Sequence, residues 1–355
     1  AIAAIPTGLP AVVTPMYSMG ARTLAGLGAI VKRLPSVETL GSVSAVCTDK
    51  TGTLTMNQMT SVEMTIPGQN HYKVTGEGYS PEGKLLNDGG TQIDLTPVLM
   101  PMALCSDATL DGDELVGDPT EGALIVLAAK GGIDLEGVRN KYPRLAVLPF
   151  DAAYKFMATF HDMTNEQGKP VVRCMVKGAP DVVIGRSNSV LLPDGEIKPL
   201  GDKGHQVALD ENQRIGEEGE RAMAVARRDF DPETFDPNAD LLEISKDLTL
   251  LGIVGIVDPP RAEANDAIAK CHSAGIQVRM ITGDHAVTAA AIGKQLGIEG
   301  TALTGAQFAA KSDDEAIKEM PDIAIVARVT PQDKIRMVTL LQRLQNIVSM
   351  TGDGV

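Results

Sequence analysis

The sequence predicts an α/β protein in which a parallel, doubly wound sheet is interrupted by an inserted α/β domain. Three observations lead to this fold class. After Asp258, strand-like and helix-like segments alternate strictly, which is typical of a parallel sheet. Far upstream, the mostly apolar run Val43–Val46 offers another strand of the same kind. For about 200 residues from Thr55, turn-rich stretches instead separate short apolar runs, which indicates an insertion.

The composition is that of a globular protein with two or three domains. The chain has 355 residues, 43% of them hydrophobic and 22% charged, so it can bury a large core. A net charge of −14 and an aromatic content of 3% argue against a nucleic-acid partner, which needs clustered cations or stacking rings. The four cysteines stand far apart without a Cys-x-x-Cys pair, which favours a reducing compartment over zinc or disulfides.

The first 21 residues carry no charged side chain, and prolines at positions 6, 10 and 15 are expected to interrupt any regular helix there. This run just reaches the lower length limit for a membrane span. The basic residues behind it, Arg22, Lys32 and Arg33, suit the cytoplasmic side of a membrane. From this stretch alone, a buried helix or an N-terminal arm of a soluble protein stays open.

The strand Val43–Val46 leads into Cys-Thr-Asp-Lys-Thr-Gly-Thr-Leu-Thr at residues 47–55. Ligands of a parallel sheet bind beyond the carboxyl ends of its strands, and Asp49 stands at such an end. Gly52 lets the backbone approach an anion, and the neighbouring hydroxyls and amides are donors for phosphoryl oxygens. We interpret Asp49 as a nucleophile for phosphate.

The inserted region contains apolar runs at Val171–Lys177 and Leu248–Val257, and turn-rich stretches at residues 75–94 and 188–204. Two acidic clusters, one at Glu217, Glu218 and Glu220 and one at Ser312–Glu315, are interpreted as solvated faces.

The rest of the parallel sheet follows the insertion. We expect helices over Pro260–Ala274, from Asp284 as cap to Gly297, and over Pro331–Gln345, and strands over Gln277–Ile281, Ile323–Ala327 and Ile347–Met350. His285 is interpreted as a helix-start residue without catalytic duty.

Polar residues follow these strands at one edge of the predicted sheet. They are Asp49, Thr282-Gly283-Asp284 and Thr351-Gly352-Asp353. Thr330 can cap a helix with Asp333 in a capping-box-like pattern, which puts Lys334 in the first turn near the same edge. A carboxylate nucleophile, a cation, a hydroxyl and a metal-binding carboxylate are the groups that phosphoryl transfer needs. The sequence therefore predicts a phosphoryl-transfer site.

These motifs resemble, in type and order, the haloacid-dehalogenase-like (Rossmannoid) phosphorylation domain of P-type cation-transporting ATPases, most closely the calcium-pump branch. The motifs are Asp49-Lys50-Thr51-Gly52-Thr53-Leu54-Thr55, Asp258-Pro259-Pro260-Arg261, Thr282-Gly283-Asp284, Lys334 and Thr351-Gly352-Asp353-Gly354-Val355. The resemblance implies that Asp49 attacks the γ-phosphoryl group of ATP. It implies that Mg²⁺ is bound by Asp49, Asp353 and the Thr51 carbonyl. The other catalytic residues that it implies are Lys334, Thr282, Gly283, Asp284, Lys50 and Arg261.

A second set of residues resembles the nucleotide-binding domain of the same family, an α/β domain with an antiparallel sheet. It contains Gly117-Asp118-Pro119-Thr120-Glu121, Phe150, Lys155, Lys177-Gly178-Ala179-Pro180 and Arg221. The resemblance implies that Phe150 stacks on adenine and that Glu121 hydrogen-bonds the base. It implies that the pocket is lined by Lys155, Lys177 and Gly178. It also implies that the phosphates are contacted by Arg221 and Thr53. From the residues alone, Phe150 after Pro149 is more often a core residue than a ligand platform, and Lys177-Gly178 could form a turn.

Two departures from related patterns bear on function. In soluble phosphatases of the superfamily, an acidic residue two positions after the nucleophile activates water. Thr51 stands in that position here. Without a carboxylate to activate water, the aspartyl phosphate is expected to persist. The segment Ile5–Pro10 resembles the broken fourth membrane helix of calcium pumps, yet Thr7 replaces the ion-binding glutamate of that helix. The transported cation therefore stays open.

The expected organisation is a partial membrane helix and stalk at residues 1–34, a phosphorylation domain at 35–57 and 258–355, and a nucleotide-binding domain at 58–257. We expect a catalytic fragment of an ATP-driven cation pump, because the family motif that begins at Thr351 continues to a second aspartate beyond Val355. Its expected partners are ATP, Mg²⁺, a cation and a lipid bilayer. The alternatives are a soluble phosphatase with a large cap and an ATP-binding module without turnover.

Overall fold

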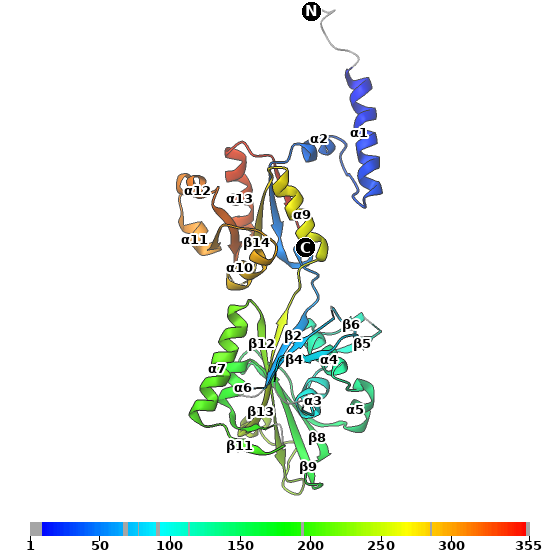
Figure 1. The fold of residues 1–355 in the computed structure, drawn as a ribbon, viewed down its shortest axis with the longest axis vertical. Helices are drawn as coiled ribbons and strands as arrows, with labels where there is room; N and C mark the ends of the chain where they lie inside the picture. The colour runs from blue at the N-terminus through cyan, green and yellow to red at the C-terminus, as the bar shows by residue number, and fades with distance from the viewer. Residues whose placement is uncertain are drawn as a thin grey trace, which may run out of the picture. The chain divides into compact units, whose positions relative to one another are not determined.

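The computed structural model describes residues 9–352 apart from 67–69, 77, 90–92, 113, 193–194 and 285, with side chains from residue 12. The chain divides into two compact units (Figure 1). Unit 1 consists of Ala1–Leu54 and Arg261–Val355, and unit 2 consists of Thr55–Pro260. Unit 2 is therefore a continuous segment inserted into unit 1.

Two helices open unit 1, α1 (Leu9–Gly26) and α2 (Ser36–Gly41). The prediction that prolines interrupt a helix here is wrong for the described residues, because α1 continues through Pro15. Pro10 falls in the first turn, where a missing N–H costs no hydrogen bond, and the single interior proline removes only one. Pro6–Thr7 lies outside the described residues. No helix in the described part of the chain has the length and apolar character that a membrane span requires.

The centre of unit 1 is a five-stranded sheet in the order β15-β16-β14-β1-β17, in which all neighbours are parallel. Its strands are β1 (Ala45–Asp49), β14 (Gln277–Thr282), β15 (Thr301–Thr304), β16 (Ile323–Ala327) and β17 (Val348–Thr351). The predicted parallel sheet is confirmed, and its last three predicted strands are correct to within one residue at each end. The first strand extends to Asp49, three residues beyond the prediction.

Helices cover this sheet: α9 (Ala262–Ser273), α10 (Ala286–Gln295), α11 (Gly305–Ala310), α12 (Asp313–Glu319) and α13 (Pro331–Arg343). In α13, Met337, Leu340 and Leu341 recur at helical spacing and are buried. They pack with Phe308 of α11 and with Cys47 of β1 in one apolar cluster. Helices α11 and α13 thus pack against β1, the strand that carries Asp49, in one apolar core.

The sequence analysis missed the three short elements β15, α11 and α12. Both helices begin with a capping box, Thr304 with Gln307 and Ser312 with Glu315. The acidic stretch at Ser312–Glu315 is therefore a helix start. This stretch is solvated as predicted: the Asp313 side chain is 42% exposed, although it pairs with Arg336 and Arg343 of α13.

Unit 2 is built on a sheet with the main order β4-β3-β2-β13-β12-β9-β8-β7, whose neighbours are antiparallel. These strands are β2 (Thr60–Ile66), β3 (Asn70–Val74), β4 (Leu85–Asn87), β7 (Arg144–Leu148), β8 (Phe156–Thr164), β9 (Pro170–Gly178), β12 (Arg221–Phe230) and β13 (Leu248–Val257). Strands β10 (Ser187–Leu191) and β11 (Ile197–Pro199) join it through a parallel β10–β13 pair. A separate hairpin consists of β5 (Thr109–Asp111) and β6 (Glu114–Val116).

Two large apolar clusters and a smaller one stabilise the described part of unit 2. The two large clusters join its sheet to helices. One joins the sheet to α3 (Thr96–Leu104), α4 (Pro119–Lys130) and α5 (Leu135–Lys141). The other joins it to α6 (Pro180–Gly185), α7 (Gly201–Glu217) and the short α8 (Leu241–Ile244). The predicted strand Leu248–Val257 is confirmed. Helix α7 was not predicted, because its first residues lay in a stretch that was interpreted as turns.

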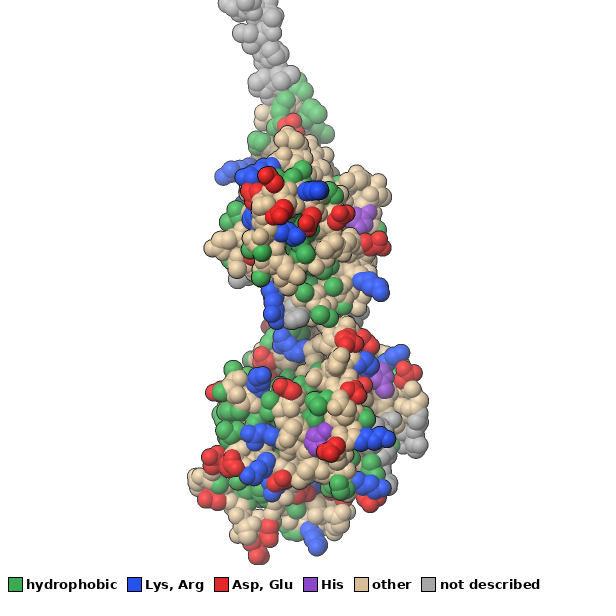
Figure 2. Space-filling model, turned by 90° about the vertical axis from the view of Figure 1, so that its left-hand side faces the viewer, with side chains coloured by type: hydrophobic (Ala, Val, Ile, Leu, Met, Phe, Trp, Pro, Cys, Tyr) green, Lys and Arg blue, Asp and Glu red, His purple; other side chains and the backbone are tan. Residues whose placement is uncertain are grey.

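Charge is mixed over the face shown in Figure 2, where acidic and basic side chains alternate without a patch of one sign. Within the acidic cluster Glu217, Glu218 and Glu220, one residue departs from this solvated pattern. Glu217 and Glu218 are exposed as predicted, but the solvated interpretation is wrong for Glu220, whose Oε2 is buried without a hydrogen-bond partner. Burial and the neighbouring Glu63 raise the pKa of Glu220 to about 8.

Candidate functional site

Asp49 is the last residue of β1, which lies between β14 and β17 in the parallel sheet. Parallel strands bring their carboxyl ends to one edge, so the residues after β14 and β17 arrive next to Asp49. The register pairs Asp49 with Ile281, directly before Thr282. A Cβ added at Gly352 would lie 3.9 Å from the Asp49 Cβ, which places the end of β17 beside the same carboxylate.

Lys334 reaches this edge from the first turn of α13. Thr330 caps the helix: its side chain accepts a bond from the Asp333 N–H at 3.3 Å, and its own N–H donates to Asp333 Oδ2 at 2.8 Å. The predicted capping box is confirmed. Lys334 follows at the next position, and its Nζ donates to Asp49 Oδ2. The cap therefore orients the cation toward the carboxylate.

A second ion pair lies at the same edge. Lys50 is 4% exposed, and its Nζ lies 2.5 Å from Asp284 Oδ2, while its backbone N–H donates to Asp49 Oδ1 at 2.9 Å. Thr282 is buried, and its Oγ1 accepts the N–H of Asp284 across Gly283. Helix α10 begins at Ala286, and the preceding residue, His285, lies outside the described residues. In the described contacts Asp284 thus orients Lys50, a role that the sequence analysis did not assign.

The turn after Asp49, Lys50–Leu54, gives the backbone its anion-facing shape. Gly52 has a φ of +72°, a left-handed conformation that glycine adopts at little cost. Arg261 closes the turn from the other end of the insertion: its Nη2 donates to the Gly52 carbonyl at 3.1 Å and its N–H to the Leu54 carbonyl at 2.8 Å. Thr51 and Thr53 are half-buried within this turn. Arg261 therefore supports the loop through these two contacts.

The predicted Mg²⁺ ligands are only partly described. The Asp49 carboxylate is 20% exposed at the sheet edge, and the Thr51 carbonyl belongs to the adjoining turn; both offer the hard oxygen ligands that Mg²⁺ prefers. Asp353 lies outside the described residues. Cys47 is fully buried two residues before Asp49, and burial raises the pKa of its thiol to about 11. That thiol stays neutral and does not compete as a nucleophile.

Unit 2 contains a separate cleft of about 510 Å³. It brings together five residues predicted for nucleotide binding: Glu121, Phe150, Lys155, Lys177 and Arg221. The other lining residues are Asp118, Thr120, Leu124, Ala179, Ala222 and Met223. The sequence analysis missed its apolar lining, although Leu124 stands three residues after Glu121 on one helix and Met223 two residues after Arg221 on one strand. These spacings put each pair on a common face.

Glu121 is fixed at the start of α4, where Asp118 is the N-cap and accepts the N–H groups of Thr120 and Glu121. Its Oε1 accepts a bond from Lys177 Nζ at 2.5 Å. Its Oε2 accepts the backbone N–H groups of Asp107 at 2.7 Å and Ala108 at 2.9 Å. A carboxylate offers about four acceptor positions, so these three donors leave about one free, on Oε1.

The turn from Pro149 to Lys155 presents Phe150 to solvent. Tyr154 donates through its hydroxyl to the Pro149 carbonyl, and the Lys155 N–H donates to the Asp151 carbonyl at 2.7 Å. Lys155 has a φ of +58°, which is strained for a residue with a Cβ and is typical of binding sites. Phe150 is 62% exposed, so the interpretation as a core residue is wrong.

Lys177 and Gly178 lie within β9, so the alternative in which they form a turn is wrong. A Cβ at Gly178 would lie 2.4 Å from the Phe156 Cβ, and this close packing explains the glycine. Arg221 begins β12, and its Nη1 lies 3.4 Å from Thr120 Oγ1 at the cleft. Thr53 lies in unit 1, outside this cleft.

Comparison with known proteins agrees with the division of the chain into two units. Residues 94–263 match the family model of the P-type ATPase, cytoplasmic domain N. Over the whole chain, the sequence is 42% identical to a cation-transporting ATPase (pma1) of Synechocystis sp., 39% to calcium-transporting ATPase 1 of Lactococcus lactis and 38% to a calcium-transporting ATPase of Bacillus subtilis. It covers 40%, 38% and 40% of these relatives. The chain is therefore similar over its whole length to P-type cation-transporting ATPases, of which it spans about two fifths.

Proposed function

We propose that the chain is the ATP-binding and phosphorylated portion of an ATP-driven cation pump. In this proposal unit 1 is a haloacid-dehalogenase-like phosphorylation domain, and unit 2 is the nucleotide-binding domain inserted into it. The compact units divide the chain after Leu54 and after Pro260, which supports a nucleotide-binding domain at residues 58–257 between the two parts of a phosphorylation domain at 35–57 and 258–355. The observation that carries the proposal is the position of Asp49 at a parallel sheet edge with Lys334 on its carboxylate.

The reaction proposed for unit 1 is an in-line displacement. Asp49 attacks the γ-phosphorus of ATP, the bond from that phosphorus to the β–γ bridging oxygen breaks, and ADP leaves as an aspartyl phosphate forms. Lys334 neutralises charge at the nucleophile, Thr282 and Gly283 contact the transferred group, and Lys50 is oriented by Asp284. Mg²⁺, bound by Asp49, the Thr51 carbonyl and Asp353, would supply further charge neutralisation.

The role proposed for unit 2 rests on its cleft. A volume of about 510 Å³ suits a nucleoside base with part of its ribose, and exposed Phe150 offers a ring on which adenine can stack. The free acceptor position of Glu121 can take the adenine amino group. Lys155, Lys177 and Arg221 add positive charge for the phosphates. Thr53 lies in the phosphorylation loop of unit 1 and is proposed to contact phosphate there.

The remaining parts of the proposal concern the whole pump. The relatives are named as cation- or calcium-transporting ATPases, which supports a transported cation and a membrane location, with both units on the cytoplasmic side. Thr7, in place of the family's glutamate, leaves the cation open. Because Thr51 replaces the acid that activates water in soluble phosphatases, the phosphoenzyme should persist until a later step hydrolyses it.

Labelling with γ-labelled Mg-ATP tests the phosphorylation. We expect an acid-stable, hydroxylamine-sensitive label on the protein that disappears in Asp49→Asn and remains in Asp314→Asn, a matched change at an exposed carboxylate of unit 1. A label that survives Asp49→Asn would contradict the assignment of the nucleophile. Rapid release of phosphate without dependence on any cation would favour the soluble phosphatase instead.

A further inference from the structure

We infer that Arg144 is a positioning residue for the nucleotide cleft of unit 2, acting through the loop that holds Glu121. This inference rests on the proposed nucleotide binding by that cleft. Arg144 does not line the cleft. Its guanidinium binds the end of α3 and the loop of residues 105–108 that leads from α3 to β5. In this loop the backbone N–H groups of Asp107 and Ala108 donate to Glu121.

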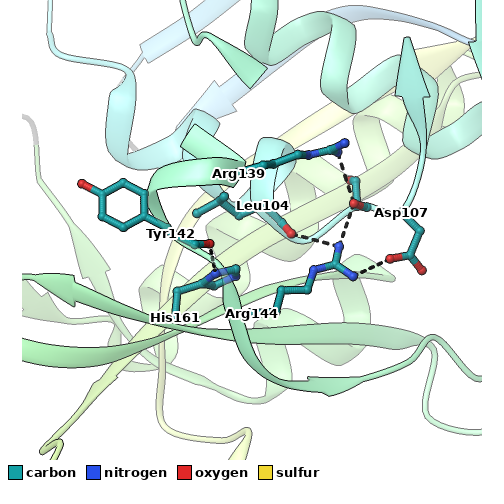
Figure 3. Close-up of a pocket in the computed structure, with 7 residues that line it drawn as sticks. Leu104, Asp107, Arg139, Tyr142, Arg144 and His161 are labelled. Carbon is teal, nitrogen blue, oxygen red and sulfur yellow. Dashed lines mark hydrogen bonds and ion pairs between the residues drawn. The ribbon is translucent and has the colours of Figure 1, made fainter. Parts of the chain in front are cut away.

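The contacts of Arg144 determine the position of this loop (Figure 3). Its Nη1 lies 2.6 Å from Asp107 Oδ1, and its Nη2 donates to the carbonyls of Ser106 at 2.7 Å and Leu104 at 3.1 Å. One planar guanidinium thus holds a side chain and two carbonyls of the same loop at once. Such forked geometry fixes orientation as well as distance.

Other contacts hold the same loop on its remaining sides. Arg139 donates from Nε to the Ala103 carbonyl at 2.9 Å and from Nη2 to the Ser106 carbonyl at 3.2 Å, so two cations meet the carbonyl end of α3. Opposite them, Gly117 has a φ of +130°, and a Cβ there would lie 2.8 Å from the Ala108 Cα. The two N–H groups that bind Glu121 are therefore held between the arginines and a closely packed glycine.

The effect passes from this loop to the cleft through Glu121. Both carboxylate oxygens of Glu121 are engaged, one by the loop and one by Lys177. A shift of the loop would move or release Oε2, and with it the orientation of Oε1, Lys177 and the free acceptor position. Arg144 is thus two contacts from the cleft, while Asp107 carries both the guanidinium contact and one of the donating N–H groups.

Arg144 also borders a cavity of about 280 Å³ with Arg139, Tyr142 and His161 (Figure 3). The charged and ring nitrogens there already bond to protein groups: those of His161, for example, contact the Tyr142 carbonyl and Thr159 Oγ1. We therefore assign no ligand to this cavity. A shorter side chain at position 144 would enlarge this cavity without a steric clash. A variant shortened at this position is therefore expected to fold, and it can be used in a binding test.

The test is isothermal titration of ATP into the protein and its variants. We expect Arg144→Gln to weaken ATP binding about fivefold. The matched control is Arg228→Gln, because Arg228 likewise binds two carbonyls and one carboxylate, those of Ile244, Lys246 and Asp247, away from the cleft. It should lower the thermal midpoint of unfolding to a similar degree and leave the dissociation constant unchanged.

A double-mutant cycle separates positioning from general destabilisation. If Arg144 acts through Glu121, Arg144→Gln combined with Glu121→Gln should bind ATP as weakly as Glu121→Gln alone. Additive losses, or an unchanged dissociation constant in Arg144→Gln while Phe150→Ala weakens binding, would overturn the inference and leave the proposed function standing. Equal ATP binding by the unchanged protein, Phe150→Ala and Glu121→Gln would overturn the nucleotide assignment itself, and the positioning role with it.

Discussion

Each unit of the molecule has a lysine–carboxylate pair at its candidate site, but the two pairs are built differently. In unit 1, Asp49 and Lys334 have side chains that are 20% and 33% exposed, and they meet at the open edge of a parallel sheet. In unit 2, Glu121 and Lys177 are 14% and 6% exposed, and two backbone N–H groups also bind the glutamate. The first pair is accessible and the second is enclosed.

This difference matches the chemistry proposed for each pair. A nucleophile must be reached by phosphorus, so Asp49 keeps part of its surface open and has only two described donors on its carboxylate, Lys334 and the Lys50 N–H. A carboxylate that orients a ligand must instead hold one position, which three donors give to Glu121. Enclosed charges depend on their partners much more than exposed ones. Substitutions in the two pairs should therefore have unequal effects on stability.

The largest expected effect comes from breaking the enclosed pair. Glu121→Ala leaves Lys177 buried without its partner and two backbone N–H groups without an acceptor, and should lower the free energy of unfolding by about 3 kcal/mol. Urea unfolding followed by circular dichroism measures this. The double variant Glu121→Leu with Lys177→Met should lose less than the single variant. An equal or larger loss in the double variant would contradict the argument that an unpaired charge causes the effect.

Glu220 is a second carboxylate of unit 2 that can be compared with Glu121. The neighbour of Glu220 is the carboxylate of Glu63 rather than a lysine. Its raised pKa means that the folded protein binds a proton more tightly than the unfolded chain. The free energy of unfolding should therefore fall as the pH rises from about 4.5 to about 8. After allowance for solvent screening, the change should be on the order of 2 kcal/mol.

Urea unfolding across this pH range measures the effect of Glu220. Glu220→Gln should lose most of the pH dependence, because a neutral amide has no proton to release. Glu217→Gln, a matched change at an exposed neighbour, should keep it. If both variants keep the slope, the assignment of the pH dependence to Glu220 is wrong.

A smaller effect is expected from the cap that orients Lys334. Thr330→Ala removes the hydroxyl that caps α13 and should cost about 1 kcal/mol in unfolding free energy. Thr304→Ala removes the same type of cap from α11 and should cost a similar amount. Only Thr330→Ala should also slow phosphoenzyme formation. Equal phosphorylation rates in the two variants would show that the cap does not position Lys334.

The smallest effect on stability belongs to the exposed pair. Lys334→Ala should lower the free energy of unfolding by no more than about 0.5 kcal/mol, because a partly solvated ion pair contributes little. The proposed role nevertheless predicts a large loss of phosphoenzyme formation. A stability loss as large as that of Glu121→Ala would remove the distinction between the two pairs.

The sequence predicted the parallel sheet of unit 1 well, because strands ending in Thr282 and Thr351 are apolar and each leads into polar residues at one edge. The capping box at Thr330 also allowed the position of Lys334 to be predicted. The Lys50–Asp284 ion pair could not be predicted from the sequence. Its two residues follow two different strands, and these strands become neighbours only in the folded sheet. Likewise, the donors on Glu121 are backbone N–H groups, which leave no pattern in side-chain chemistry.

Unit 2 was predicted less completely. Strand Leu248–Val257 is apolar throughout and was evident, whereas α7 starts at Gly201 among glycines and prolines that resemble turns. Half-buried Glu220 stands in an acidic run with two exposed glutamates, so the local composition predicted a solvated side chain. Its burial results from tertiary packing beside Glu63, which overrides local sequence preference.

The bridge between Thr55 and Pro260 has a consequence for the order of folding. Pairing β1 with β14 closes a chain loop that contains all of unit 2, about 200 residues. If unit 2 forms first, its own ends are already joined at this bridge and the effective loop between β1 and β14 shrinks to roughly 20 residues. That saves about 2 kcal/mol of closure entropy. Hydrogen-exchange labelling during refolding should therefore show protected amides in β9 and β13 before those in β1.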